Sequence, residues 1–225
     1  PGLHLIKSGG AETAQTAVVN GEIIGLIEVK GHDGSNLGTR GAAIEFQVDA
    51  TGLGSIAGDQ IPTDILFKTA AGSSGDDIAS KMVLTADGNL GIGTVSPETL
   101  LEVRGGTGAG FDCAGILTLS TAETSISNGS SDVLGAILFQ APVEDVAGGH
   151  TGDAILPSAG IWATAEQSFH PSDNSTKLHF ATAASETARQ TGNIRMTIDS
   201  TGNVGIGTTA PNSPLTVGAA DGNSM

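Results

Sequence analysis

Residues 88–97 of this chain read Gly-Asn-Leu-Gly-Ile-Gly-Thr-Val-Ser-Pro, and residues 202–211 read Gly-Asn-Val-Gly-Ile-Gly-Thr-Thr-Ala-Pro. The two copies lie 114 residues apart, and an ungapped alignment of Met82–Val103 with Met196–Val217 has ten identities in 22 positions. Repetition at a fixed period indicates an array in which each unit buries its apolar face against neighbours. Such arrays build length and surface, and they seldom build one active site.

The repeat covers nearly the whole chain, because three upstream markers recur ahead of both motifs. The pairs are Gly25-Leu26-Ile27 with Gly135-Ala136-Ile137, Ala42-Ala43-Ile44 with Ala159-Gly160-Ile161, and Leu66–Ala71 with Phe180–Ala184. We therefore expect a first β-repeat unit at 1–105, a Gly-rich junction at 106–111, a second unit at 112–218 and the start of a further linker at 219–225. Since the chain opens with Pro1, we also expect an excerpt from a longer polypeptide.

The motifs alternate apolar and small or polar residues with a period of two, which is typical of β-strands. Met196 and Ile198 precede a turn at 200–203, and Val204 and Ile206 follow it. Asn and Gly accept the positive φ of a tight hairpin turn. We predict a hairpin in each motif, ended by the motif proline and followed by a short Leu-x-Val strand. The predicted fold class is all-β.

Glycine weakens a strand, so its alternating placement predicts close backbone contact, with a neighbouring chain or with another layer of the same chain. We expect Met82, Leu84, Ile92, Met196, Ile198 and Ile206 to form a buried stripe. The motif residues with predicted structural roles are Gly88, Asn89, Gly91, Ile92, Gly93, Thr94 and Pro97, and Gly202, Asn203, Gly205, Ile206, Gly207, Thr208 and Pro211.

Both copies fit the pattern Met-x-(Ile/Leu)-x-x-x-Gly-Asn-(Val/Leu)-Gly-Ile-Gly-Thr-x-x-Pro-x-x-x-Leu-x-Val. This pattern resembles the repeat of bacteriophage tail fibres and related virion appendages, where it often precedes a self-cleaving chaperone domain. The resemblance spans most of the 225 residues and implies β-rich repeats intertwined in a parallel homotrimer. No region resembles the chaperone domain or a distal catalytic domain, which favours a shaft segment. Similar repeats also occur in bacterial surface and secreted proteins.

The composition independently favours a multimer. Glycine makes up 34 of 225 residues, aromatic residues only 3% and charged residues 15%, where about 7% glycine and about 25% charged residues are usual. Small side chains contribute less to a core than the about 1.5–3 kcal/mol of a buried Leu or Phe. A chain of this kind is more plausible if it also buries surface against identical copies.

The net charge of −15 excludes two classes of partner. Nine scattered basic residues offer no stripe for nucleic-acid phosphates, and an anionic membrane surface would repel the chain. No apolar run approaches the ~20 residues of a membrane-spanning helix. We interpret the acidity as a device for solubility, and the single cysteine, Cys113, as a small buried hydrophobe.

The sequence nominates no catalytic, cofactor or metal site. The Gly-Ile-Gly-Thr core is an incomplete dinucleotide motif outside any βαβ unit, and no nucleophile elbow, zinc motif or calcium loop is present. His150 with Asp153 and His170 with Asp173 have a spacing that could serve a metal or an acid–base pair, but we favour solvated loop residues. Trp162, Phe169 and His170 are the candidate recognition residues for a host surface glycan, with Trp162 more plausible in the core.

These observations lead to one main functional prediction and two alternatives. We expect a non-enzymatic shaft segment of a phage tail fibre, which extends the fibre and presents a host-recognition tip. It would be virion-associated and extracellular, with copies of itself and other fibre or tail proteins as partners. The first alternative is a bacterial surface adhesin or extracellular filament built from the same repeat. The second is a carbohydrate-binding or carbohydrate-degrading spike segment.

Overall fold

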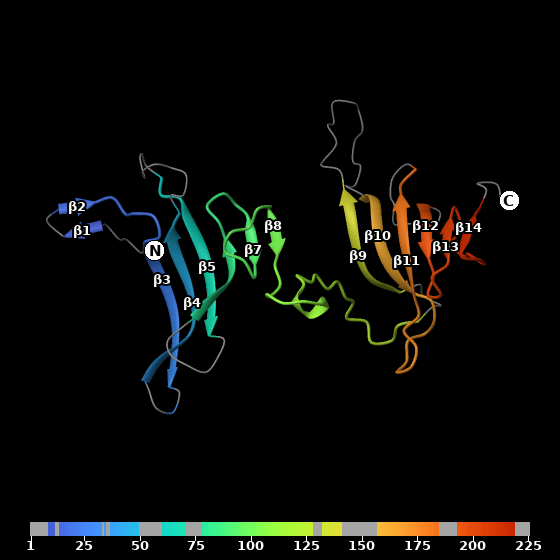
Figure 1. The fold of residues 1–225 in the computed structure, drawn as a ribbon, viewed down its shortest axis with the longest axis horizontal. Helices are drawn as coiled ribbons and strands as arrows, with labels where there is room; N and C mark the ends of the chain where they lie inside the picture. Colours follow the sequence, from blue (N-terminus) through green and yellow to red (C-terminus); the bar gives the residue numbers. More distant parts are fainter. Residues whose placement is uncertain are drawn as a thin grey trace, which may run out of the picture. The chain divides into compact units, whose positions relative to one another are not determined.

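The computed structural model of the chain describes residues 9–11, 14–32, 34, 37–49, 60–70, 78–127, 132–140, 157–184 and 193–218. Within these ranges the regular structure consists of β-strands and one short 3-10 helix, η1 (Phe111–Cys113), so the predicted all-β class is confirmed (Figure 1). The chain divides into two compact units, Pro1–Leu117 and Thr118–Met225. The linker expected at 219–225 lies outside the described residues.

The first unit contains a six-stranded sheet whose strands follow one another in chain order. They are β3 (Ile23–His32), β4 (Leu37–Val48), β5 (Thr63–Ala70), β6 (Ile78–Leu84), β7 (Leu90–Ile92) and β8 (Leu101–Val103). Neighbouring strands are antiparallel except for the last pair, β7 and β8, which is parallel. A separate two-stranded ribbon, β1 (Gly9–Ala11) with β2 (Ala14–Thr16), precedes this sheet.

The second unit repeats the same topology. Its strands are β9 (Val133–Gln140), β10 (Pro157–Ala165), β11 (Thr176–Thr182), β12 (Ile194–Ile198), β13 (Val204–Ile206) and β14 (Leu215–Val217). The sheet order again follows the chain, and the last pair, β13 and β14, is again parallel. Each motif therefore forms the predicted hairpin and the predicted short third strand.

The interior of both units is thin. Among the described residues, the largest side chains with less than 2% exposure are Val48, Val83 and Thr197. Val83 and Thr197 occupy equivalent places, on β6 and β12, and each lies on the face of its sheet that the motif loop covers. The small number of buried large side chains is consistent with the low aromatic content of the sequence.

The expected buried stripe is wrong for the single chain. Leu84, Ile92 and Ile206 are 39%, 41% and 46% exposed, and Met82, Met196 and Ile198 are half-buried. The buried residues of the two motif hairpins are the alternate ones: Val83, Gly91, Thr197 and Gly205. The predicted alternation along the strands is present, but the opposite face of the sheet is the covered one. The reason is that each motif folds its own loop over the face that contains Gly91 or Gly205.

Candidate assembly surface

The turn of each motif is closed by the same set of contacts. The amide of Thr85 donates to the carbonyl of Asn89 at 2.9 Å, and the amide of Asp199 donates to that of Asn203 at 3.0 Å. Gly88 and Gly202 follow with φ of 86° and 87°, a region that side chains other than glycine enter at a cost. The amides of Asn89 and Asn203 donate to the Thr85 hydroxyl and the Asp199 carboxylate.

Gly91 and Gly205 lie where the chain crosses back over its own sheet. A Cβ atom on Gly91 would stand 2.6 Å from the carbonyl oxygen of Thr94, and one on Gly205 would stand 2.6 Å from that of Thr208. Thr94 is 7% exposed, and Pro97 in the same crossover is buried. The close contact expected at these glycines therefore forms within the chain, between the strand and the crossover.

The crossover ends in a parallel return strand. Gly93 and Gly207 reverse the chain with φ of 75° and 73°. The amide of Arg104 then donates to the carbonyl of Ile92, and that of Gly218 to the carbonyl of Ile206, both at 2.8 Å. Parallel neighbours usually need a connection of a dozen or more residues. Residues 93–100 make this one in eight, because glycine lets the backbone pass directly over the sheet.

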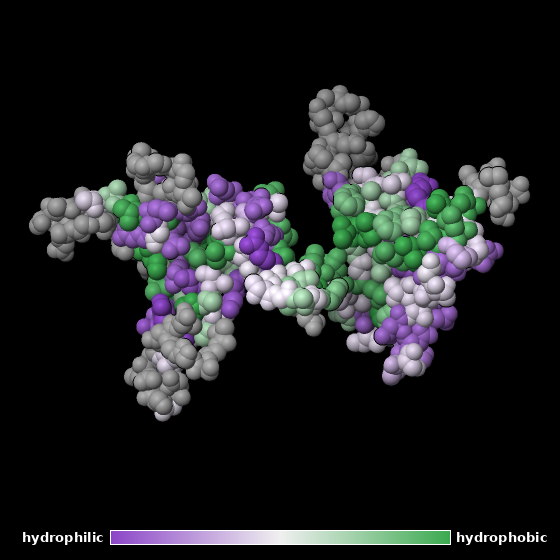
Figure 2. Space-filling view, viewed as in Figure 1, coloured by the Kyte–Doolittle hydropathy of each residue, from purple (hydrophilic) through white to green (hydrophobic). Residues whose placement is uncertain are grey.

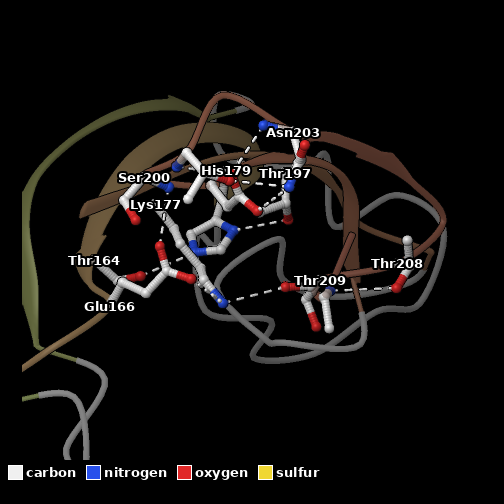
Figure 3. Close-up of polar contacts among 12 residues, drawn as sticks. Thr164, Glu166, Lys177, His179, Thr197, Ser200, Asn203, Thr208 and Thr209 are labelled. Atoms are coloured by element: carbon white, nitrogen blue, oxygen red, sulfur yellow. Dashed lines mark hydrogen bonds and ion pairs between the residues drawn. The ribbon is translucent and has the colours of Figure 1, made fainter. Parts of the chain in front are cut away.

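The covered face of the second unit carries a polar network (Figure 3). The hydroxyl of Thr164 lies 2.9 Å from Nε2 of His179, and that of Thr197 lies 3.0 Å from Nδ1. Trp162 stands beside the ring, with 5.9 Å between ring centroids. Burial lowers the pKa of His179, and the nearby Lys177 charge adds to this effect. A neutral ring with one donor and one acceptor nitrogen fits these two hydroxyl partners.

Lys177 and Glu166 attach the crossover and the turn to the sheet. The Lys177 ammonium lies 3.2 Å from Glu166 Oε1 and donates to the carbonyl of Thr209 at 3.4 Å. The amide of Ser200 donates to Glu166 Oε2 at 2.9 Å. Partial burial alone would raise the pKa of Glu166, but the hydrogen bonds from Ser200 and Lys177 hold it below its ordinary value. These contacts are structural, since each one fixes a loop of the motif.

The other face of each sheet is apolar, and no described strand of the chain packs over it. In the first unit the pairing register aligns one residue from every strand into a continuous central row. The row consists of Ile27, Ile44, Phe67, Met82, Ile92 and Val103. A flanking row contains Gly25, Phe46, Ile65, Leu84, Leu90 and Leu101. None of these residues is buried.

The second unit has the same two rows. Its central row consists of Ile137, Ile161, Phe180, Met196, Ile206 and Val217, and its flanking row of Gly135, Ala163, Leu178, Ile198, Val204 and Leu215. We call the two rows of each unit its apolar face. None of the second set is buried either, and Figure 2 shows hydrophobic residues over much of the visible surface of this unit.

The central rows of the two units are identical in residue type at all six strands, in the order Ile, Ile, Phe, Met, Ile, Val. The next residue of each strand lies on the opposite, covered face, and the row that these residues form differs between the two units. In the first unit it reads Leu26, Glu45, Leu66, Val83, Gly91 and Glu102, and in the second Ala136, Trp162, His179, Thr197, Gly205 and Thr216. Glycine is the one type that these rows share at a common position. The two units thus keep their uncovered faces alike while their covered faces differ.

The candidate recognition residues do not form a common site. Trp162 is half-buried on the covered side, beside His179. His170 is exposed in a tight turn in which it exchanges two backbone hydrogen bonds with Asp173, and Phe169 precedes it, half-buried. The Asp173 carboxylate accepts hydrogen bonds from the hydroxyl and amide of Ser175, which lower its pKa. His150 and Asp153 lie outside the described residues.

No metal or membrane site emerges from the part of the chain that the structure describes. No three His, Cys, Asp or Glu residues gather there closely enough to hold a metal ion. No helix in these ranges has the length and apolar character to cross a membrane. Cys113 is half-buried in η1 rather than fully buried as expected.

The sequence predicted six members of the apolar face as a buried stripe, namely Met82, Leu84, Ile92, Met196, Ile198 and Ile206, but it did not predict that this face continues across the upstream strands. Each upstream marker nevertheless contains a member of the central row. Ile27 and Ile137, Ile44 and Ile161, and Phe67 and Phe180 all stand in the marker pairs that defined the repeat. The signal was their alignment with Met82 and Ile92 across strands, which becomes visible only with the pairing register.

Two of three comparisons with known proteins find no match. No protein-family model matches the chain, and no curated protein sequence matches it. Among solved structures, the carboxy-terminal domain of the bacteriophage T5 L-shaped tail fibre is similar at 14% identity with a TM-score of 0.36, over 99% of this chain and 91% of that chain. The same domain with its intramolecular chaperone domain is similar at 14% identity and a TM-score of 0.32, over 94% and 60%. Likeness at this level carries no inference about function.

Proposed function

We propose that this chain is a structural shaft segment of a bacteriophage tail fibre or a similar virion fibre. It works as a parallel homotrimer that extends the fibre and presents a host-recognition tip. Its place is in the virion, outside the host cell, and its partners are copies of itself and other fibre or tail proteins. The motif resemblance supports the class of protein, and the chain's own structure supports a mechanical role.

The observation that carries the proposal is the repeated central row. Each of the six positions of the row has the same residue type in both units, on a face over which no described strand packs. A fold that repeats its outer apolar face and varies its interior has a use for that face in both units. Assembly along the length of a fibre provides such a use.

The mass and shape of the purified chain test this proposal. Light scattering after size exclusion should give three times the 22.3 kDa of one chain, and an unboiled SDS gel should show a resistant band. Negative-stain images should show rods. A monodisperse monomer of 22.3 kDa would contradict the fibre role.

The carbohydrate-active alternative has its own test. A spike segment that degrades saccharides needs two carboxylates converging at about 5–10 Å, and the described carboxylates with lowered pKa values are engaged in structural contacts such as Glu166 with Lys177 and Ser200. We expect no release of reducing sugar from host polysaccharide. Release that survives purification would favour the spike instead.

A further inference from the structure

We propose that the apolar face of each unit is the surface through which copies of this chain associate. The copies would lie parallel and in register, so that each face packs against the same face of its neighbours. This inference rests on the proposed function and deepens it, because it assigns the contact between copies to particular residues and to one side of each sheet.

The chain itself covers the two sides of each sheet to different extents. The covered side is occupied by the crossover of the same chain, where the Thr94 and Thr208 carbonyl oxygens lie against Gly91 and Gly205. The apolar face keeps Ile27 at 48% exposure, Ile137 at 50% and Val217 at 49%. Contiguous apolar surface of this kind marks interaction sites in soluble proteins.

The charge distribution favours an identical copy as the occupant. Two chains of net charge −15 repel each other, so a contact between copies is favoured on surface without charge. Neither row of the apolar face contains a charged residue in either unit. The row behind contains Glu45 and Glu102 in the first unit, and Lys177 and Glu166 lie on the covered side of the second.

The repetition points to the same occupant. A partner of this chain must present a complementary surface twice, at the spacing of the repeat. A second copy does so by construction, since its two central rows have the same residue types in the same strand order. An unrelated partner would need its own matching repeat.

The two-unit chain also selects the register. When one unit has docked on its counterpart, the second unit is held at high effective concentration next to its own counterpart. A stagger by one unit leaves an apolar face bare at each end of the assembly. When first units pair with first units and second units with second units, the apolar faces of both units are covered in every chain. Closed symmetric assemblies form through such contacts.

Two adjacent residues of β3 provide a matched test. Ile27 belongs to the apolar face and is 48% exposed, while Leu26 belongs to the covered side and is 39% exposed. We would compare Ile27→Asp with Leu26→Asp by light scattering, with circular dichroism to verify that each retains its strands. The expected result is loss of the assembled species for Ile27→Asp and its retention for Leu26→Asp.

Single-cysteine variants test the register without disrupting the face. In a Cys113→Ser background, chains with Ile27→Cys and chains with Ile137→Cys would be refolded together and treated with a short bismaleimide. We expect crosslinks between two Ile27→Cys chains and between two Ile137→Cys chains, and none that join one variant to the other. Mixed crosslinks would overturn the in-register arrangement.

The outcomes separate this inference from the proposed function. If the wild type assembles and Leu26→Asp dissociates while Ile27→Asp does not, the face is wrongly assigned and the fibre role stands. If the wild type assembles, neither aspartate variant dissociates and neither Ile27→Cys nor Ile137→Cys chains crosslink, the face is again wrongly assigned and the fibre role stands. If the wild type is monomeric, both the inference and the homotrimer fail.

Discussion

Gly205 and Gly91 occupy the positions where the crossover comes closest to the sheet. A methyl group on Gly205 would stand 2.6 Å from the Thr208 carbonyl oxygen and 3.0 Å from its Cγ2 atom. Backbone cannot yield as cheaply as a flexible side chain, so we expect Gly205→Ala to lower the free energy of unfolding by about 1–3 kcal/mol. Gly205→Val should cost more and should also impair assembly. Chemical denaturation monitored by circular dichroism measures the first effect.

Gly41 offers a matched control, because it also lies within a strand. A Cβ atom there would meet only the Val29 carbonyl oxygen at 3.6 Å, an ordinary contact. Gly41→Ala should therefore be neutral or slightly stabilising, since alanine loses less backbone freedom on folding. Equal stability of Gly41→Ala and Gly205→Ala would refute the close contact at Gly205.

His179 makes the second unit sensitive to acid. Burial, aided by the Lys177 charge, lowers its pKa in the folded state, whereas an unfolded chain keeps a histidine pKa of about 6.5. The unfolded state therefore binds the proton more readily, and stability falls as the pH drops below about 6.5 towards the folded pKa. Above about pH 6.5 this group should contribute no pH dependence.

The variant His179→Leu isolates this contribution, since Leu66 occupies the equivalent position of the first unit. We expect the wild type to lose stability between pH 6.5 and about pH 5, before the carboxylates titrate. His179→Leu should lose less over the same range, whatever its stability at pH 7. Parallel pH profiles for the wild type and His179→Leu would count against the prediction.

At the scale of the element, both motif turns are anchored by a carboxylate from outside the motif. Asp64 Oδ1 accepts a hydrogen bond from the amide of Ala86 at 2.8 Å, and Glu166 Oε2 accepts one from Ser200 at 2.9 Å. Ala86 and Ser200 are equivalent turn positions, but Asp64 lies on β5 and Glu166 follows β10. The two units therefore make the same contact although the accepting carboxylate comes from a different strand in each.

We expect Asp64→Ala to destabilise the first unit by about 1–2 kcal/mol, because it leaves the turn amide without its charged acceptor. Hydrogen exchange of the Ala86 amide should become faster. Asp87→Ala, on the exposed part of the same turn, should leave this exchange rate unchanged. An unchanged Ala86 rate in Asp64→Ala would show that the turn holds without its anchor.

The sequence predicted the elements that depend on local chemistry. Gly88 and Asn89 indicate a turn, and the alternation of Met196 and Ile198 with polar residues indicates a strand. It did not predict which face is covered, because that depends on the crossover from Gly93 lying over Gly91. The sequence also did not predict that β8 pairs with β7 in parallel, since a connection of eight residues ordinarily predicts an antiparallel partner.

The candidate assembly surface could likewise be predicted where it depends on local sequence, and not where it depends on pairing between distant strands. The spacing of the motif predicted its glycines, and the carbonyl oxygens nearest to Gly91 and Gly93 belong to Thr94 and Arg104, only three and eleven residues further along the chain. The central row joins residues as distant as Ile27 and Val103, through five successive strand pairings. No local pattern specifies such a row, because each pairing register is set by contacts between strands that the loops separate.

At the scale of the whole molecule, the chain combines strong self-repulsion with an uncharged apolar face. A net charge of −15 on each copy opposes association, while the contact surface contains no ion pairs that salt could weaken. The Debye length falls from about 30 Å at 0.01 M to about 8 Å at 0.15 M ionic strength. Added salt should therefore screen the repulsion and leave the apolar contact intact.

We accordingly expect the assembled fraction, measured by light scattering at fixed protein concentration, to rise between 10 mM and 150 mM sodium chloride. The midpoint of thermal unfolding should rise with protein concentration at either salt level, because the folded copies stabilise one another by mass action. The variant Ile27→Asp should show neither dependence if it is monomeric. An assembled fraction that falls with added salt would instead mean that charged residues hold the copies together. That result would favour a contact on the covered side of the first sheet, whose charged residues include Glu45, Lys68 and Glu102.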